Sequence, residues 1–203
     1  MSEIVCYFSP QSGYAYLGHP RVVAIARAHG ASILWRPVDI LKVFAEGGST
    51  APAKQSPQRN AYRKSDIVRW ARLRGIPINT EPAYWPTDTL PACRLIAAAQ
   101  LQGIDPTDLI GACLAAVWAR NLQIAERATL VRLADEVGLD GAGLAELSES
   151  VAANEQVARN TAEAIAAGVF GSPSYVVNGE LYFGQDRLDF VDAALGGHAE
   201  GAQ

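Results

Sequence analysis

Residues 5–17 read VCYFSPQSGYAYL, and they join the first strand-like segment of the chain to the first helix-like segment. Residues 4–8 are mostly β-branched or aromatic, which favours a strand. Residues 9–13 have the Ser, Pro and Gly content typical of a turn, and an apolar helical face begins at Tyr14. We therefore predict a strand–turn–helix joint that places Ser12 at the N-terminus of a helix.

Ser12 has two interpretations at this position. Backbone N–H groups without partners at a helix N-terminus favour negative charge, so a hydroxyl there can help to hold an anion such as a thiolate. Alternatively, Ser12 only caps the helix. Residue 15 is Ala rather than the Glu or Gln of a capping box, and this stretch alone does not separate the two interpretations.

The clearest β-sheet signal lies near the C-terminus. Residues 174–177 and 180–183 are strand-like tetrapeptides on either side of Asn178-Gly179, which is the sequence most typical of a two-residue hairpin turn. Asp186 follows, and its residue type predicts the N-cap of a last helix.

The middle of the chain, residues 39–168, contains no convincing strand. Apolar residues at helical spacing predict helices near 62–74, 88–101, 106–118, 129–137 and 150–167. Residues 41–58 are rich in Gly, Ser, Ala and Pro, and we predict a long loop there, whose length suggests a function.

The predicted order of elements is β-α-β, a helical block, then β-β-α. This order indicates an α/β protein with a thioredoxin-like fold, in which an all-helical insertion separates the βαβ half from the ββα half. The thioredoxin-like domain would comprise residues 1–38 and 169–197, and the insertion residues 39–168.

Pro173 stands where the thioredoxin fold has a cis-proline, before the third strand and facing the loop at the start of the first helix. X–Pro bonds are the peptide bonds for which the cis form costs little, so the assignment is plausible. The alternative is a proline that only ends a strand at the edge of a sheet.

Composition excludes several classes of protein. The net charge of −4 argues against a nucleic-acid partner. A basic cluster at helical spacing is interpreted as a solvated helix face; its members are Arg59, Arg63, Lys64, Arg69, Arg72 and Arg74. No apolar run is long enough to span a bilayer, and the N-terminus lacks a signal-peptide pattern, so we expect no membrane association and a cytoplasmic location.

The three cysteines, Cys6, Cys93 and Cys113, form no C-x-x-C pair and have no His at metal-ligand spacing. We predict buried free thiols, which excludes a self-contained disulfide oxidoreductase and a metal site. A hydrolase that uses Ser12 with His19 is disfavoured, because the nucleophile motif G-x-S-x-G is absent.

Motifs along the chain carry a family resemblance. They are S-x-Y-A-Y-L at 12–17, R-W-A at 69–71, W-P and T-L-P within 85–91, G-V-F-G-S-P at 168–173 and G-Q-D-R at 184–187. In these motifs, over nearly its whole length, the chain resembles the 2-hydroxychromene-2-carboxylate isomerase family, which belongs with kappa-class glutathione transferases and DsbA-like thioredoxin-fold proteins.

The chain departs from that family at several positions. Ser9 and Gly13 stand where the family usually has an aspartate and a proline, and Ser172 stands where it usually has a valine. Ser49 replaces a common loop asparagine, and Arg59 replaces an expected lysine. Ser9 competes with Ser12 for the catalytic role, although the distance to the Y-A-Y-L motif favours Ser12.

The resemblance implies that glutathione is bound as a cofactor. Ser12 would then be the catalytic residue, lowering the pKa of the glutathione thiol. The implied cofactor-binding residues are Ser12, Ser172, Pro173, Gln185, Asp186 and Arg187. The backbone of Ser172 would pair with the cysteinyl backbone of glutathione, and Asp186 and Arg187 would meet its charged γ-glutamyl end.

The resemblance also implies the reaction, an interconversion of 2-hydroxychromene-2-carboxylate and trans-o-hydroxybenzylidenepyruvate by reversible thiolate addition in naphthalene-type catabolism. The substrate is a small aromatic carboxylate. Candidate carboxylate-binding residues are Arg36, Lys54 and Arg59, and candidate ring walls are Tyr84 and Trp85. A homodimer is implied as well.

Two other functions fit the same residues. A kappa-type glutathione transferase would conjugate the thiolate to an electrophile, and only its acceptor pocket would differ. A DsbA-like domain that has lost its cysteine pair would bind a peptide or partner along the cis-proline edge, without catalysis.

Overall fold

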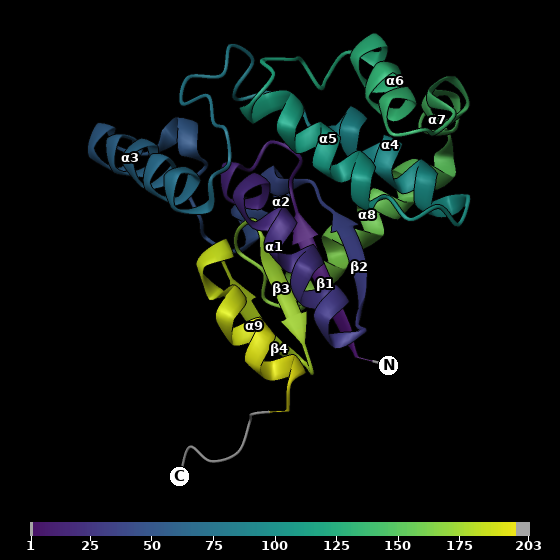
Figure 1. The fold of residues 1–203 in the computed structure, drawn as a ribbon. Helices are drawn as coiled ribbons and strands as arrows, with labels where there is room; N and C mark the ends of the chain where they lie inside the picture. The colour runs from purple at the N-terminus through teal and green to yellow at the C-terminus, as the bar shows by residue number, and fades with distance from the viewer. Residues whose placement is uncertain (1, 198–203) are drawn as a thin grey trace.

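The computed structural model describes residues 2–197, except the side chain of Ala53. Its elements in chain order are β1 (Glu3–Phe8), α1 (Gly13–His29), β2 (Ser32–Pro37), α2 (Ile40–Glu46), η1 (Pro52–Lys54), α3 (Pro57–Arg74), α4 (Leu90–Leu101), α5 (Thr107–Trp118), α6 (Arg127–Glu136), α7 (Gly141–Leu147), α8 (Val151–Ala166), β3 (Ser174–Val177), β4 (Glu180–Phe183), η2 (Gln185–Arg187) and α9 (Leu188–Leu195). Figure 1 shows their arrangement around the sheet.

The sheet has four strands in the order β2-β1-β3-β4. β1 pairs in parallel with β2, and Cys6 lies opposite Trp35. β1 pairs antiparallel with β3, and β3 with β4. Two parallel strands joined by a helix, followed by an antiparallel hairpin and a helix, are the two halves of a thioredoxin fold, so the predicted fold class is confirmed.

The hairpin between β3 and β4 turns at the two predicted residues. Asn178 has φ 52° and Gly179 has φ 82°. Positive φ at both central residues is what a type I′ turn requires, and Asn-Gly is the sequence that adopts it most readily.

Helices cover both faces of the sheet. Successive residues of a strand point to opposite faces, so Ile4 and Cys6 of β1 belong to a core that includes residues of α1 and α9. Tyr7 of β1 faces the other way and packs with residues of α2 and α8. In Figure 1, α1 and α8 lie on opposite sides of the strands.

One hydrophobic core extends from the sheet into the helical block. It contains Leu17 and Trp35 from the N-terminal half together with Leu95, Ile110 and Leu133 from α4, α5 and α6. The predicted boundary at residues 39 and 168 therefore separates segments that share buried surface, and the division into two domains stays a prediction. No helix among residues 2–197 has the length and apolar character that crossing a membrane needs.

The predicted loop over residues 41–58 is partly wrong. Residues 40–46 form α2, whose first turn is capped by Asp39 accepting from the N–H groups of Leu41 and Lys42. Ile40 and Val43 are its buried residues. A helix of seven residues shows too few apolar repeats to be recognised beside a Gly- and Ser-rich segment.

Three other features of the secondary structure also differ from the prediction. α3 begins at Pro57, with Ser56 as its cap, rather than at residue 62. The short helix α7, capped by Asp140, was not predicted. Asp186 does not cap α9: it lies in the 3₁₀ turn η2, and neither η2 nor α9 has a side-chain cap hydrogen bond.

Candidate functional site

Ser12 makes two hydrogen bonds at the start of α1. Its Oγ accepts from the N–H of Ala15 at 3.1 Å, which is the predicted helix cap. The same hydroxyl donates to the carbonyl oxygen of Ser172 at 3.0 Å. Ser12 therefore caps the helix and also directs its proton toward the segment that precedes β3.

The N-terminus of α1 has electrostatic capacity for an anion. Among residues 2–197, the backbone N–H groups of Gly13 and Tyr14 have no hydrogen-bond partner, and the first turn of α1 contains no acidic residue. Because these N–H groups and the helix dipole favour negative charge, the surroundings of the Ser12 hydroxyl suit a thiolate or a carboxylate.

Ser172 and Pro173 lie directly opposite this helix terminus. Their peptide bond is cis. The Ser172 Oγ accepts from the N–H of Ser9 at 2.9 Å, and the carbonyl of Pro173 accepts from the N–H of Gly184 at 2.9 Å. These bonds fix the segment between the end of β1 and the end of β4.

The structure distinguishes the two serines of the loop. Ser9 is 1% exposed, and its Oγ is buried without a hydrogen-bond partner. Its backbone is used structurally, since its carbonyl accepts from the N–H of Ser12 at 2.9 Å. Ser12 is half-buried and can be reached from solvent. Ser12 is thus the better placed of the two to meet a ligand.

The protein's own cysteines do not serve this site. Cys6, Cys93 and Cys113 are free and buried, as predicted. Burial raises the pKa of all three thiols, that of Cys113 to about 12. Thiolates are the nucleophilic form of cysteine, so any sulfur chemistry at Ser12 needs a thiol from outside the chain.

A concave surface of about 400 Å³ lies along β4 and η2. Asp186 and Arg187 line it together with Tyr182 and Phe183. Gln185 does not line it: its side chain is buried beside Gly18 of α1, with both amide atoms unpaired. Two of the three predicted residues of this motif therefore face a space that a ligand can occupy.

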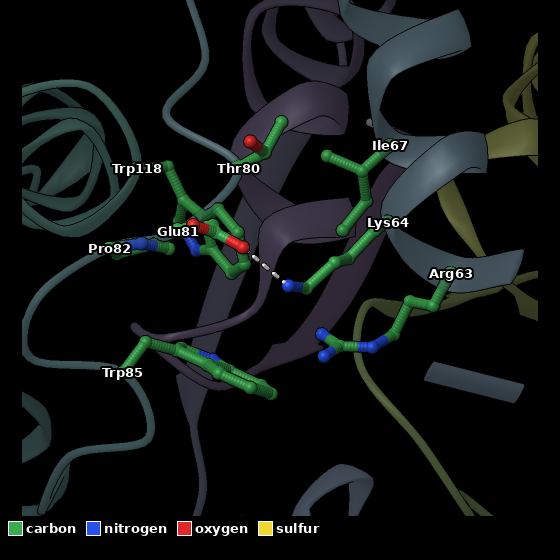
Figure 2. Close-up of a pocket in the computed structure, with 8 residues that line it drawn as sticks. All are labelled: Arg63, Lys64, Ile67, Thr80, Glu81, Pro82, Trp85 and Trp118. Carbon is green, nitrogen blue, oxygen red and sulfur yellow. Dashed lines mark hydrogen bonds and ion pairs between the residues drawn. The ribbon is translucent and has the colours of Figure 1, made fainter. Parts of the chain in front are cut away.

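A second cavity, of about 280 Å³, lies between α3, the segment 79–86 and the end of α5. Figure 2 shows the residues that form it, among them Arg63, Lys64 and Ile67 of α3, Glu81 and Trp85 of the connecting segment, and Trp118 of α5. The Trp85 and Trp118 ring centroids are 6.0 Å apart, so the cavity has two indole walls.

This cavity adjoins the Ser12 loop. The indole N–H of Trp118 donates to the carbonyl of Gln11 at 3.1 Å. A Cβ placed on Gly13 would lie 3.0 Å from the Trp118 ring and 3.1 Å from the Cδ1 of Ile67. A ligand in the cavity and a group held by Ser12 would therefore lie on two sides of the same short loop.

The predicted substrate residues are divided by the structure. Trp85 lines the cavity, whereas Tyr84 does not and is 45% exposed. Arg36 lies on β2, where its Nε is 3.2 Å from Glu163. Lys54 ends η1, and Arg59 lies in the first turn of α3; neither lines this cavity. Their roles stay predictions.

Arg63, Lys64 and Trp118 line the cavity, but they were not predicted as site residues from the sequence. The interpretation of the whole basic cluster as a solvated face is wrong for Arg63, which stacks on Trp85 with its Cζ 4.2 Å from the ring centroid. It is also wrong for Arg74, which donates to the carbonyl of Leu17 at 2.6 Å. Residues on the inner side of a basic helix have the same composition signal as those on its outer side.

Comparison with known proteins places the chain among thioredoxin-fold proteins. Residues 3–196 match the family described as DSBA-like thioredoxin domain. The chain is 28% identical to the 2-hydroxychromene-2-carboxylate isomerase of Sphingobium xenophagum over 190 residues, which cover 93% of this chain and 95% of the relative. It is 24% identical to glutathione S-transferase kappa 1 of Homo sapiens, covering 94% and 89% of the two chains.

A solved structure of a 2-hydroxychromene-2-carboxylate isomerase has a TM-score of 0.77 to this chain at 24% identity, covering 97% of this chain and 95% of that one. At this identity the structural likeness shows the fold alone. The predicted fold and the predicted resemblance to the isomerases and the kappa-class transferases are confirmed.

Proposed function

Since the chain belongs to the DSBA-like thioredoxin domain family, we propose that it is a glutathione-dependent isomerase that interconverts 2-hydroxychromene-2-carboxylate and trans-o-hydroxybenzylidenepyruvate. One observation carries the proposal: the Ser12 hydroxyl lies at the N-terminus of α1 and donates to the carbonyl of Ser172, beside the cis peptide bond that precedes Pro173. The relatives named as isomerases support the reaction class.

The residues at the site suit glutathione. Its sulfur would meet the Ser12 hydroxyl and the unpaired N–H groups of α1. Its cysteinyl backbone would pair with Ser172, whose N–H has no partner among the described residues. Its charged γ-glutamyl end would meet Asp186 and Arg187 in the concave surface along β4. Pro173 would lie beside this pairing, since the carbonyl that precedes it already accepts from the Ser12 hydroxyl.

Gln185 would act from behind this site. Its backbone carbonyl accepts from the Nη2 of Arg74 at 3.2 Å, and its side chain packs at Gly18 of α1. It would thereby hold the η2 turn, and with it Asp186 and Arg187, against α1 without contacting the cofactor through its side chain.

The reaction requires rotation about a carbon–carbon double bond of the substrate. Bound glutathione would supply the thiol whose reversible addition lowers the order of that bond. The chain's own residues stabilise the charge: the Ser12 hydroxyl donates a hydrogen bond to an anion at the α1 terminus, and the helix dipole adds to it. The indole rings of Trp85 and Trp118 in the neighbouring cavity would give a planar substrate two apolar walls.

The reaction is tested by following the absorbance change of 2-hydroxychromene-2-carboxylate with and without glutathione. We expect turnover only with glutathione. No turnover in its presence contradicts the proposal. Formation of a stable glutathione conjugate with an electrophile would instead favour a kappa-type transferase, and absence of glutathione binding would favour a partner-binding domain.

A cytoplasmic location, a homodimer and a role in naphthalene-type catabolism belong to the same proposal. Three free, buried cysteines support a reducing compartment, because disulfides are rare in the cytosol. The homodimer and the pathway rest on the resemblance. Sedimentation at micromolar concentration tests the dimer, and a mass of 21.6 kDa would contradict it.

A further inference from the structure

Arg63 is a cation without an anionic partner, on the wall of an aromatic cavity. Its Nε is buried and has no hydrogen-bond partner, and no carboxylate of the described residues lies within ion-pair distance of it. Burial lowers the pKa of Arg63, yet a guanidinium stays protonated at neutral pH. A partly buried charge without a partner is costly, so an anion bound here would relieve that cost.

Lys64, the other cation of the cavity, already has a carboxylate partner. Its Nζ lies 2.8 Å from the Oε1 of Glu81. Figure 2 shows this pair across the cavity, with the guanidinium of Arg63 directed into the space beside Trp85. Of the two neighbouring cations, Arg63 is therefore the one available to a ligand.

The rest of the cavity suits a flat apolar group. Trp118 and Ile67 form walls, and both also contact the position of Gly13 in the Ser12 loop. Ile67 lies one turn of α3 beyond Arg63. A ligand that placed an anionic group at Arg63 and its ring along Ile67 and Trp118 would lie beside Gly13, the residue that follows Ser12 in the chain.

We propose that Arg63 is the anion-binding residue of this cavity and that the cavity takes planar aromatic carboxylates, with the carboxylate on the Arg63 guanidinium and the ring against Ile67 and Trp118. A planar guanidinium can bind a carboxylate through two parallel hydrogen bonds. This inference deepens the proposed function by naming the residue that recognises the substrate, and it rests on that function only for the reaction that follows binding.

The competing explanation is that Arg63 only stacks on Trp85 as a structural contact. In that case the cavity would bind a neutral aromatic amide as well as the matching acid. The two explanations are separated by calorimetric titration of the full-length protein, without glutathione, with 1-naphthoate and with the neutral isostere 1-naphthamide.

The wild-type protein should bind 1-naphthoate about tenfold or more tightly than 1-naphthamide, as expected for a charge-assisted hydrogen-bonded pair. Arg63→Gln should remove this preference while leaving 1-naphthamide binding unchanged. Arg72→Gln is the matched control, because Arg72 lies on the same helix, is exposed and does not line the cavity. Unchanged 1-naphthamide binding also shows that the Arg63→Gln cavity is intact.

Equal affinity of the wild type for the two ligands, no binding of 1-naphthoate at millimolar concentration, or a preference that survives Arg63→Gln would each overturn the inference. The proposed function fails separately. A carboxylate preference that depends on Arg63, without glutathione-dependent isomerisation, would overturn the function and leave the binding site standing. Glutathione-dependent isomerisation without that carboxylate preference would overturn the Arg63 binding site and leave the proposed function standing.

Discussion

The Oγ of Ser12 and the carbonyl oxygen of Ser172 lie 3.0 Å apart, and because a carbonyl only accepts, the serine hydroxyl is the donor. This bond joins the two halves of the thioredoxin-like fold at the place where a cofactor is proposed to bind. It also orients the hydroxyl toward the cis-proline segment rather than toward open solvent. A sulfur anion arriving there would compete with the Ser172 carbonyl for the Ser12 proton.

Ser12→Ala tests the two roles of this hydroxyl. Loss of the cap should lower the free energy of unfolding by about 1 kcal/mol, and loss of an anion-stabilising donor should lower glutathione-dependent turnover about 10²-fold. Ser150→Ala is the matched control, since Ser150 caps α8 by accepting from the N–H of Ala153 at 3.2 Å. It should cost similar stability and leave turnover unchanged. Equal turnover losses in the two variants would contradict a chemical role for Ser12.

The cysteines should be unreactive in the folded protein. All three are buried and their thiol pKa values are raised by burial, so Ellman's reagent at pH 8 should detect no rapid reaction in native buffer. In guanidinium chloride it should detect all three thiols. A fast-reacting thiol in the native protein, lost in Cys6→Ala, would argue that the chain supplies its own sulfur.

Tyr14→Phe tests how α1 is tied to the cavity wall. The Tyr14 hydroxyl donates to the Oδ2 of Asp66 at 3.0 Å, between Arg63 and Ile67 on α3. Loss of this hydrogen bond should lower the free energy of unfolding by about 1 kcal/mol. It should also raise the KM for the aromatic substrate severalfold, because α3, which carries Arg63 and Ile67, would be held less firmly against α1.

Tyr16→Phe serves as the control for that variant. It removes a comparable hydrogen bond from the same helix, to the carbonyl of Pro77 at 2.8 Å. Similar stability losses with a KM change confined to Tyr14→Phe are expected. The same KM in both variants would show that the Tyr14 contact has no special bearing on the substrate.

Glu81→Gln should strengthen binding of an aromatic carboxylate. The substitution removes a negative charge from the cavity and releases Lys64, which is paired with Glu81 at 2.8 Å. Because both side chains are solvent-exposed, the gain should be modest, about two- to fivefold in the dissociation constant of 1-naphthoate. Titration calorimetry measures this gain. A larger dissociation constant for 1-naphthoate in Glu81→Gln than in the wild type would argue against an anion at this wall.

His19 should make the fold less stable in acid. Burial lowers its pKa, although the hydrogen bond to the Thr107 carbonyl and the nearby Asp108 act in the opposite direction. The unfolded chain therefore takes up the proton first. The stability that the neutral His19 contributes is fully present above the ordinary histidine pKa of about 6.5. It is lost as the pH falls from that value through the lower pKa of His19 in the folded protein.

Urea unfolding at pH 7.5 and pH 5.0 checks this expectation. The loss of stability between the two pH values should be smaller in His19→Gln than in the wild type. An equal loss in both proteins would assign the acid sensitivity to other groups.

The terminal elements were predictable because their signals are local. The end of α1 at Gly30 needs a left-handed residue, and Gly30 has φ 59°. The β3–β4 turn needs two residues with positive φ, and Asn178 and Gly179 are these residues. In contrast, α2 has only seven residues, and its helical state depends on burying Ile40 and Val43 in the core that it shares with residues of α8. Such a contact has no sequence pattern of its own.

The sequence by itself determined the order of the four strands with the helices α1 and α9 that flank them, the turn residues and the position of Ser12 at a helix terminus, because backbone dihedral preferences and capping depend on near neighbours in the chain. Only the tertiary structure decided which of the six basic residues of α3 packs against Trp85 on the wall of the cavity. Arg63 and Arg72 have the same charge on the same helix, and they differ because Trp85, from a distant segment, packs over one and not the other. Contacts between distant segments are set by the packing of the whole core.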